Sequence, residues 1–169
     1  TACDPCTQGY LCVKGASAPQ PCPGGTHANQ TVLNLTGYLS SLDECVVCPA
    51  GTSCSVGTDK PMPCLPGSFS AASQASTCDL CPAGKFQRLY GQTVCMACTP
   101  GFYCRAGAAE PTPCPAGTVG NATGLYSENQ CTYVPAGFWA PLGSNIPKPC
   151  PPSGFYCPGA LRDTQFGGA

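Results

Sequence analysis

One cysteine spacing occurs three times, and it constrains the fold more than any other feature of the chain. Four cysteines separated by two, five and nine residues form each of three groups: Cys3, Cys6, Cys12 and Cys22; Cys45, Cys48, Cys54 and Cys64; Cys95, Cys98, Cys104 and Cys114. Such recurrence indicates tandem repeats of a small unit. We expect repeats at 1–44, 45–77, 78–94 (short), 95–130 and 131–169 (degenerate).

The residues between the cysteines repeat as well. Each group has a glycine turn after its second cysteine, and each nine-residue gap has a glycine three positions after its cysteine: Gly9, Gly51 and Gly101, and Gly15, Gly57 and Gly107. A Pro-x-Pro pair precedes each fourth cysteine. Glycine permits positive φ at a turn, and paired prolines keep the chain extended. The units are therefore predicted to consist of turns and short extended segments.

Two stretches depart from the spacing: the group that begins at Cys78 has no third or fourth cysteine, and the group that begins at Cys131 has no second or third. The second departure suggests which cysteines pair. Val134 and Ala140 stand where the unit that begins at Cys131 should have its second and third cysteines. Because a bridge is lost as a pair, we expect the second cysteine of a unit to bond the third, and the fourth to bond the first of the next unit. The predicted bridges are Cys6–Cys12, Cys22–Cys45, Cys48–Cys54, Cys64–Cys78, Cys81–Cys95, Cys98–Cys104, Cys114–Cys131 and Cys150–Cys157.

Cys3 is left unpaired by this rule, since its partner would be the fourth cysteine of a preceding unit. The absence of an initial methionine likewise favours a fragment or a processed product. A nested scheme, Cys54–Cys64 inside Cys48–Cys78, fits the short unit equally well but leaves Cys150 without its partner. A one-three, two-four scheme of the EGF type would leave both Cys131 and Cys150 without partners. Spacing alone does not fix connectivity, so the three schemes remain open at this point.

The composition explains why bridges are needed. Of 169 residues, 17 are cysteine, whereas Leu, Val, Ile and Phe together supply 26. Too few aliphatic side chains are present for a core of ordinary size. Charged residues make up 9% and the net charge is −1, which argues against nucleic acid as a partner. No apolar run is long enough for membrane insertion by this segment.

Metal binding and catalysis are weaker readings of the same residues. The spacing of Cys78, Cys81, Cys95 and Cys98 is close to that of a zinc ribbon. However, the longer cysteine frame is not needed for zinc, and we expect His27 to lie in a surface turn. The carboxylates are few and scattered, with no Ser/His/Asp or Cys/His arrangement. We therefore expect neither an enzyme nor a metal or cofactor site.

Two kinds of surface feature remain. Asn-x-Thr sequons begin at Asn29, Asn34 and Asn121, all in long loops between cysteines, so N-linked glycans are expected there. Aromatic residues mostly follow the glycine turns, and we expect each ring to cover a disulfide or to cap the neighbouring unit, with one ring of a double aromatic left exposed. They are Tyr10, Phe69, Phe86, Phe102, Tyr103, Phe138, Trp139, Phe155 and Tyr156.

The turns themselves resemble a known repeat. Cys64-Leu-Pro-Gly-Ser-Phe, continuing to Cys78-x2-Cys81, and Cys81-Pro-Ala-Gly-Lys-Phe, continuing to Cys95-x2-Cys98, are similar to ephrin-receptor-like cysteine-rich repeats. These belong with the EGF-like and tumour-necrosis-factor-receptor-like modules. The resemblance implies secreted or cell-surface proteins whose irregular hairpins are strung into rods, including large surface and mastigoneme-like proteins of protists and algae.

We therefore expect small disulfide-rich tandem repeats, mostly loop with short antiparallel β-ribbons, in an elongated rod. The favoured function is a structural repeat segment of a larger secreted or cell-surface glycoprotein, for example in an extracellular filament or coat. Its partners would be other segments or copies of that assembly, together with N-linked glycans. The alternative is a receptor or adhesion ectodomain that binds a protein ligand, and a charged or aromatic patch confined to one unit would favour it.

Overall fold

The structure is a computed structural model that describes residues 6–153 and 156–159. The predicted free cysteine, Cys3, and the aromatic residue Phe155 lie outside the described residues. Within the described ranges the chain consists mostly of loops that connect strands of two or three residues.

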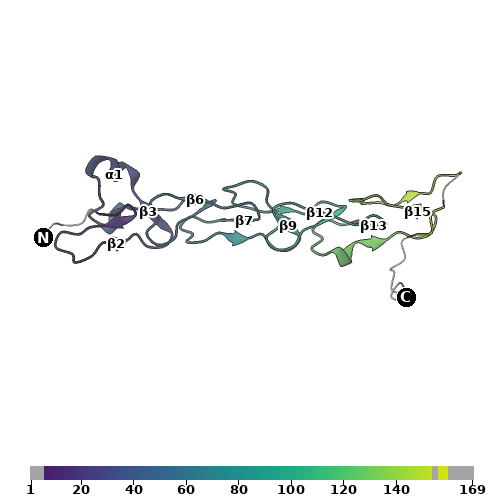
Figure 1. Cartoon of the computed structure of the whole chain (residues 1–169), viewed down its shortest axis with the longest axis horizontal. Coiled ribbons are helices and arrows are strands. Elements are labelled where there is room, and N and C mark those ends of the chain that lie inside the picture. The colour runs from purple at the N-terminus through teal and green to yellow at the C-terminus, as the bar shows by residue number, and fades with distance from the viewer. Residues whose placement is uncertain (1–5, 154–155, 160–169) are drawn as a thin grey trace, which may run out of the picture. The chain divides into compact units, whose positions relative to one another are not determined.

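Eight antiparallel two-stranded ribbons make up the regular structure of these ranges (Figure 1). Each ribbon opens with a four-residue turn that ends in glycine, runs out along one strand and returns along a second. The pairs are β1 (Tyr10–Leu11) with β2 (Gln20–Pro21), β3 (Thr26–Ala28) with β4 (Cys45–Val47), β5 (Thr52–Ser53) with β6 (Met62–Pro63), β7 (Ser68–Phe69) with β8 (Asp79–Leu80), β9 (Lys85–Phe86) with β10 (Met96–Ala97), β11 (Phe102–Tyr103) with β12 (Thr112–Pro113), β13 (Thr118–Val119) with β14 (Thr132–Tyr133), and β15 (Phe138–Trp139) with β16 (Lys148–Pro149). The predicted class, small disulfide-rich ribbons in tandem, is confirmed.

The opening turns have a finer period than the cysteine groups. We call them Cys-x-x-Gly turns; they begin at Cys6, Cys22, Cys48, Cys64, Cys81, Cys98, Cys114 and Val134, the last with valine in place of cysteine. Successive turns start 16 or 17 residues apart except where the loop of the β3–β4 or β13–β14 ribbon is longer. Each boundary between the five predicted ranges falls inside a ribbon, because the ranges begin at a cysteine on or next to a returning strand.

The longer loops contain the helical segments. Helix α1 (Gln30–Thr36) begins after Asn29, whose side chain accepts hydrogen bonds from the N–H groups of Thr31 and Val32, and it ends at Gly37 with φ of 80°. The 3-10 turns η1 (Leu42–Glu44) and η2 (Glu128–Gln130) each begin with a capping box. None of these segments was expected from the sequence.

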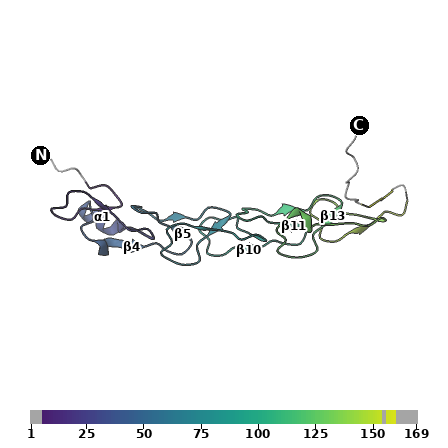
Figure 2. The ribbon, with the colours of Figure 1, turned by 90° about the horizontal axis from the view of Figure 1, so that it is seen from below.

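The chain divides into two compact units. Unit 1 comprises residues 1–80 and 87–95, and unit 2 comprises residues 81–86 and 96–169. Turned by 90°, the view in Figure 2 shows β4 near helix α1 in unit 1, and β11 and β13 in unit 2.

Buried apolar side chains form several small clusters instead of one core. In unit 1, Leu11, Cys22, Ala28 and Leu39 form one such cluster, against which Val32, Leu33 and Cys45 pack. In unit 2, separate clusters surround Cys98 and Cys104, and Cys114 and Cys131. Most of the side chains that are fully buried are cysteines. The bridges therefore occupy the space that aliphatic residues fill in an ordinary domain.

Candidate functional site

A backbone contact between ribbons recurs along the chain, and it is the best-defined local geometry of the molecule. In unit 2, the N–H of Gly143 donates to the carbonyl of Cys114 at 2.9 Å, and the N–H of Cys114 donates to the carbonyl of Gly101 at 2.8 Å. The carbonyl of Gly143 meanwhile lies against the Cα of Gly101, where any β-carbon would clash. Gly101 also has φ of 90°, which L side chains rarely adopt. Glycine is therefore required at this turn for two reasons.

The same contact joins a turn to the loop of the ribbon two places further along. The loop residue has positive φ in every case. The contacting pairs are Gly9 with Gly57, Gly25 with Gln74, Gly51 with Gly91, Gly84 with Gly124, and Gly101 with Gly143. The N–H of each loop residue also donates to a cysteine carbonyl at 2.8–2.9 Å: Gly57 to Cys22, Gln74 to Cys48, Gly91 to Cys64, Gly107 to Cys81, Gly124 to Cys98, and Gly143 to Cys114. This recurring contact between ribbons is therefore made by main-chain atoms.

The disulfides follow the pairing rule that the gaps in the cysteine frame suggest. The short bridges join cysteines six or seven residues apart and are Cys6–Cys12, Cys48–Cys54, Cys98–Cys104 and Cys150–Cys157. The long bridges join cysteines 14 to 23 residues apart and are Cys22–Cys45, Cys64–Cys78 and Cys114–Cys131. Cys81 and Cys95 are disulfide-bonded as well. The nested and the EGF-type schemes are wrong, because Cys54 bonds Cys48 and Cys64 bonds Cys78.

The bonded cysteines also remove the zinc alternative. Cys78 is bonded to Cys64, and Cys98 is bonded to Cys104. Both partners lie outside the four cysteines whose spacing is close to that of a zinc ribbon, so neither Cys78 nor Cys98 offers a thiolate. Across residues 6–153 and 156–159, no group of three or more His, Cys, Asp or Glu side chains is placed to hold a metal ion.

One ribbon has an apolar contact where a bridge would stand. Val134 and Ala140 are 4% exposed each and pack with Val119. They occupy the positions that Cys98 and Cys104 occupy in the β11–β12 ribbon. Two small apolar residues therefore replace the pair of sulfurs, as expected if those two positions face each other.

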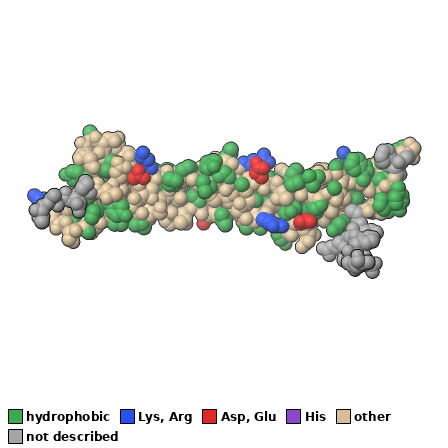
Figure 3. Space-filling model, viewed as in Figure 1, with side chains coloured by type: hydrophobic (Ala, Val, Ile, Leu, Met, Phe, Trp, Pro, Cys, Tyr) green, Lys and Arg blue, Asp and Glu red, His purple; other side chains and the backbone are tan. Residues whose placement is uncertain are grey.

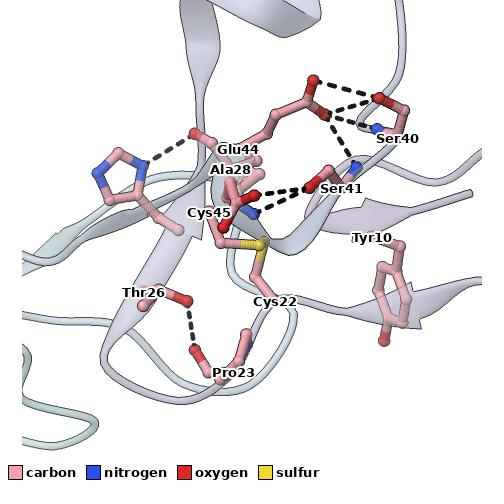
Figure 4. The surroundings of a disulfide bond; sticks show 12 residues. Tyr10, Cys22, Pro23, Thr26, Ala28, Ser40, Ser41, Glu44 and Cys45 are labelled. Atoms are coloured by element: carbon pink, nitrogen blue, oxygen red, sulfur yellow. Dashed lines mark hydrogen bonds between the residues drawn. A yellow bond between two sulfur atoms is a disulfide. The ribbon is translucent and has the colours of Figure 1, made fainter.

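The surroundings of the Cys22–Cys45 bridge show how side chains hold a long loop (Figure 4). The N–H groups of Ser40 and Ser41 and the hydroxyl of Ser40 donate to the Glu44 carboxylate. These hydrogen bonds, above all that from the Ser40 N–H, hold the pKa of Glu44 below its usual value. The loop before Cys131 uses the same device without charge, since Gln130 accepts from Tyr126 and Ser127.

The Ser-x-x-Glu and Ser-x-x-Gln patterns directly before Cys45 and Cys131 are the sequence signal that could have found these turns. The expectation for His27 was wrong. His27 lies in strand β3 instead of a turn, because its backbone pairs with Val46 of β4. Its side chain is half-buried, with Nδ1 2.9 Å from the carbonyl oxygen of Ala28.

The three sequon asparagines lie in different settings. Asn34 is exposed on helix α1, and Asn121 is exposed in the loop between β13 and β14. Asn29 is half-buried and uses its side-chain oxygen to cap the helix. The two exposed residues are therefore the more accessible candidates for glycans.

Aromatic rings cover bridges in the middle of the chain but not near its end. Phe86 is buried against Cys98 and Cys104, and Tyr103 against Cys114 and Cys131. In contrast, Phe138 and Trp139 are 38% and 41% exposed, and the Lys148 ammonium lies 5.4 Å from the centre of the Trp139 ring. The space-filling view shows other hydrophobic side chains scattered over the visible surface, with few charges (Figure 3).

Comparison with known proteins adds no family assignment. No family model matches the chain, and no match was found among the curated proteins. The fold and the contacts define the class as tandem disulfide-stapled ribbons, a kind of scaffold typical of an oxidising environment. In the described part of the chain, no helix has the length and apolar character needed to cross a membrane.

Proposed function

We propose that this chain is a structural repeat segment of a larger secreted or cell-surface glycoprotein. The observation that carries the proposal is the contact between Cys-x-x-Gly turns and left-handed loops, which recurs at five glycine positions. A contact made by main-chain atoms extends an array without specifying a ligand. Stability in such arrays comes from the repeats and the interfaces between neighbours. The same logic suits an extracellular filament or coat, and it includes no catalytic role.

The localisation part of the proposal rests on the cysteines and the sequons. Disulfides in this number persist in oxidising compartments and are rare in the cytosol. The exposed Asn34 and Asn121 could carry N-linked glycans in the same compartment. The likeness of the turns to ephrin-receptor-like and EGF-like repeats agrees with this setting.

A receptor or adhesion ectodomain is the second candidate, and one observation favours it. Phe138 and Trp139 are both exposed on β15, whereas the aromatic residues of strands β9 and β11 are buried or half-buried. Trp139 and Tyr156 line a hollow of about 390 Å³. Aromatic residues of this kind are enriched at the centres of protein interfaces. Among the described strands, β11 and β15 each have two aromatic residues, and both rings are exposed only on β15.

Electron microscopy of native material labelled with an antibody to this chain distinguishes the two. Label on ordered extracellular polymers or coats supports the structural role. Dispersed labelled monomers that bind a saturable protein ligand, with loss of binding on Trp139→Ala, support the ectodomain role. A cytosolic label, together with many free thiols in unreduced and denatured protein, would contradict both.

A further inference from the structure

A hollow of about 250 Å³ lies beside the Cys114–Cys131 bridge in unit 2. Its walls come from the turn that opens the β13–β14 ribbon, from both strands of that ribbon and from the η2 turn. Thr118 and Cys131 are buried, and the Thr118 hydroxyl donates to the carbonyl of Pro115 at 2.7 Å. The hollow is therefore built on backbone that a disulfide and a buried hydroxyl hold in place. The other lining residues are Ala116, Glu128, Asn129 and Tyr133.

Three side chains at the hollow have polar groups without a partner. Among the described residues, the Glu128 carboxylate, the Asn129 amide group and the Tyr133 hydroxyl make no hydrogen bond or ion pair. Together they offer carboxylate and amide oxygens as acceptors, and amide and hydroxyl hydrogens as donors. Tyr133 adds the apolar face of its ring. This combination suits a small ligand that has an apolar face and several hydroxyl or amide groups.

The β3–β4 ribbon has the same frame without these groups. Each of the two ribbons has a capping box directly before its bridged cysteine, so Leu42 corresponds to Glu128 and Val47 to Tyr133. The polar lining is thus particular to the β13–β14 ribbon. Leu42 and Val47 are 54% and 49% exposed, although further ribbons follow them in the described chain, and Tyr133 is 44% exposed. The exposure of this face is therefore a property of the ribbon itself.

We propose that the hollow binds one neutral sugar residue of the N-acetylglucosamine type. The hydroxyl groups and the acetamido N–H of such a sugar are donors for the Glu128 carboxylate, and its carbonyl is an acceptor for the Asn129 amide. The apolar face of the pyranose ring packs on Tyr133. The volume is below the roughly 300–1,000 Å³ of pockets for drug-sized ligands, as expected for a single sugar ring. The inference goes beyond the proposed structural role.

Two sources could supply this sugar. N-linked glycans begin with N-acetylglucosamine, and the exposed sequon residue Asn121 lies in the loop of the same β13–β14 ribbon. The glycan of a neighbouring molecule in the extracellular assembly has the same chemistry. The hollow would hold a glycan against the protein in either case.

An NMR titration of the oxidised 169-residue chain, produced without glycans, tests the proposal. The probe is the methyl β-glycoside of N-acetylglucosamine. Saturable shifts are expected at the amides of Asn129 and Tyr133, with a dissociation constant in the millimolar range, as a ligand of about 16 non-hydrogen atoms allows. No saturable shift up to the solubility limit of the glycoside would overturn the proposal.

Tyr133→Val removes the ring and introduces the residue that the β3–β4 ribbon has at Val47. Its dissociation constant for the glycoside should rise about tenfold, equivalent to roughly 1.4 kcal/mol. Tyr126→Val is the matched control, because Tyr126 is exposed in the same loop but does not line the hollow. Equal weakening in the two variants would overturn the assignment of the site.

A cation is the competing ligand, and Glu128 distinguishes it from a sugar. Glu128→Gln keeps an acceptor oxygen and loses the charge, so binding of the neutral glycoside should weaken only about threefold. Glu110→Gln, in the loop between β11 and β12 and outside the hollow, should leave binding unchanged. If n-butylammonium bound more tightly than the glycoside and lost its binding in Glu128→Gln, the hollow would be a cation site and the proposal wrong.

Secreted protein with a glycan on Asn121 distinguishes the two sources. Glycoside binding that appears only after glycosidase treatment assigns the hollow to the glycan on Asn121. Equal binding before and after treatment assigns it to glycans of other molecules. Failure of the titration with glycan-free protein would refute the sugar site and leave the extracellular structural role intact, since that role is tested by the location and thiol content of native material.

Discussion

The carbonyl group of Gly91 occupies the space in which a β-carbon on Gly51 would have to stand. Gly51 donates its N–H to the carbonyl of Ser70 at 2.9 Å, and Gly91 donates its N–H to the carbonyl of Cys64 at 2.9 Å. Both glycines have positive φ. Two main-chain segments 40 residues apart in sequence are therefore in direct contact, with no side chain between them.

Replacing Gly51 by alanine should destabilise unit 1 strongly. A β-carbon at this position would have positive φ and would also overlap the Gly91 carbonyl, so we expect a loss of about 2–4 kcal/mol in the free energy of unfolding. Gly37→Ala has the strain without the overlap and should lose only about 1 kcal/mol. Thermal unfolding of the oxidised proteins measures the difference, and equal losses would show that the overlap relaxes.

Replacing Gln74 by glycine should stabilise the protein. Gln74 has φ of 68° and occupies the loop position that is glycine in the neighbouring ribbons. Relief of left-handed strain should outweigh the added freedom of the unfolded chain and gain about 0.5 kcal/mol. Gln8→Gly, at an exposed turn position without positive φ, should instead cost a few tenths of a kcal/mol. A lower melting temperature for Gln74→Gly would contradict the prediction.

Cysteines introduced together at Val134 and Ala140 should form a bridge. The two positions are separated by six residues, as Cys98 and Cys104 are, and both are buried in one cluster. A loop of this length should add about 2.4 kcal/mol on the chain-entropy estimate. Thiol titration of the denatured, unreduced double variant checks the bond, and each single variant supplies the control with one extra free thiol. Two extra titratable thiols in the double variant would refute it.

Acid should weaken the η1 turn before it weakens η2. Hydrogen bonds from Ser40 and Ser41 favour the charged form of Glu44 and lower its pKa in the folded state. The stabilisation is therefore complete above the ordinary pKa of a glutamate, about 4.3, and is lost as the pH falls through the lower folded value. Gln130 makes the equivalent bonds without titrating.

Hydrogen exchange monitors this difference directly. Protection of the Ser40 and Ser41 amides, corrected for intrinsic exchange, should fall between pH 6 and pH 3, whereas protection of the Tyr126 and Ser127 amides should not. Glu44→Gln should make the first pair as insensitive to pH as the second. Parallel losses at both turns would assign the effect to general unfolding.

Glycans should attach to Asn34 and Asn121 more completely than to Asn29. The first two side chains are exposed, whereas Asn29 is half-buried and caps helix α1. Glycosidase treatment and peptide mass spectrometry of secreted protein measure the occupancy. Asn29→Asp retains a good helix cap and removes the sequon, so its helix should persist. Preferential modification of Asn29 would contradict the ranking.

The disulfide pattern could be predicted because bridges are lost in pairs. Val134 and Ala140 mark two positions that face each other, and that single gap in the frame distinguishes the observed pairing from its alternatives. The glycines of the turns were likewise recognisable, since Gly9, Gly51 and Gly101 recur at one place in the spacing.

The contacts between ribbons could not be predicted in the same way. They join main-chain atoms of residues such as Gly84 and Gly124, and no side-chain pattern records which loop meets which turn. Helix α1 was missed because seven residues are too few for a periodic apolar pattern. Its boundaries were nevertheless marked by Asn29 and Gly37, a good N-cap and a good C-terminal residue.

The ribbon that packs Val134 on Ala140 also has a mechanical consequence. When a chain is pulled from its ends, a loop closed by sulfur cannot lengthen, however much of its hydrogen bonding is lost. The segment between Val134 and Cys150 lacks such a closure and can be drawn out by about 50 Å at the length of an extended chain. The unclosed segment of a bridged ribbon, such as Cys104 to Cys114, is shorter, so under tension the β15–β16 ribbon would lengthen more than its bridged neighbours.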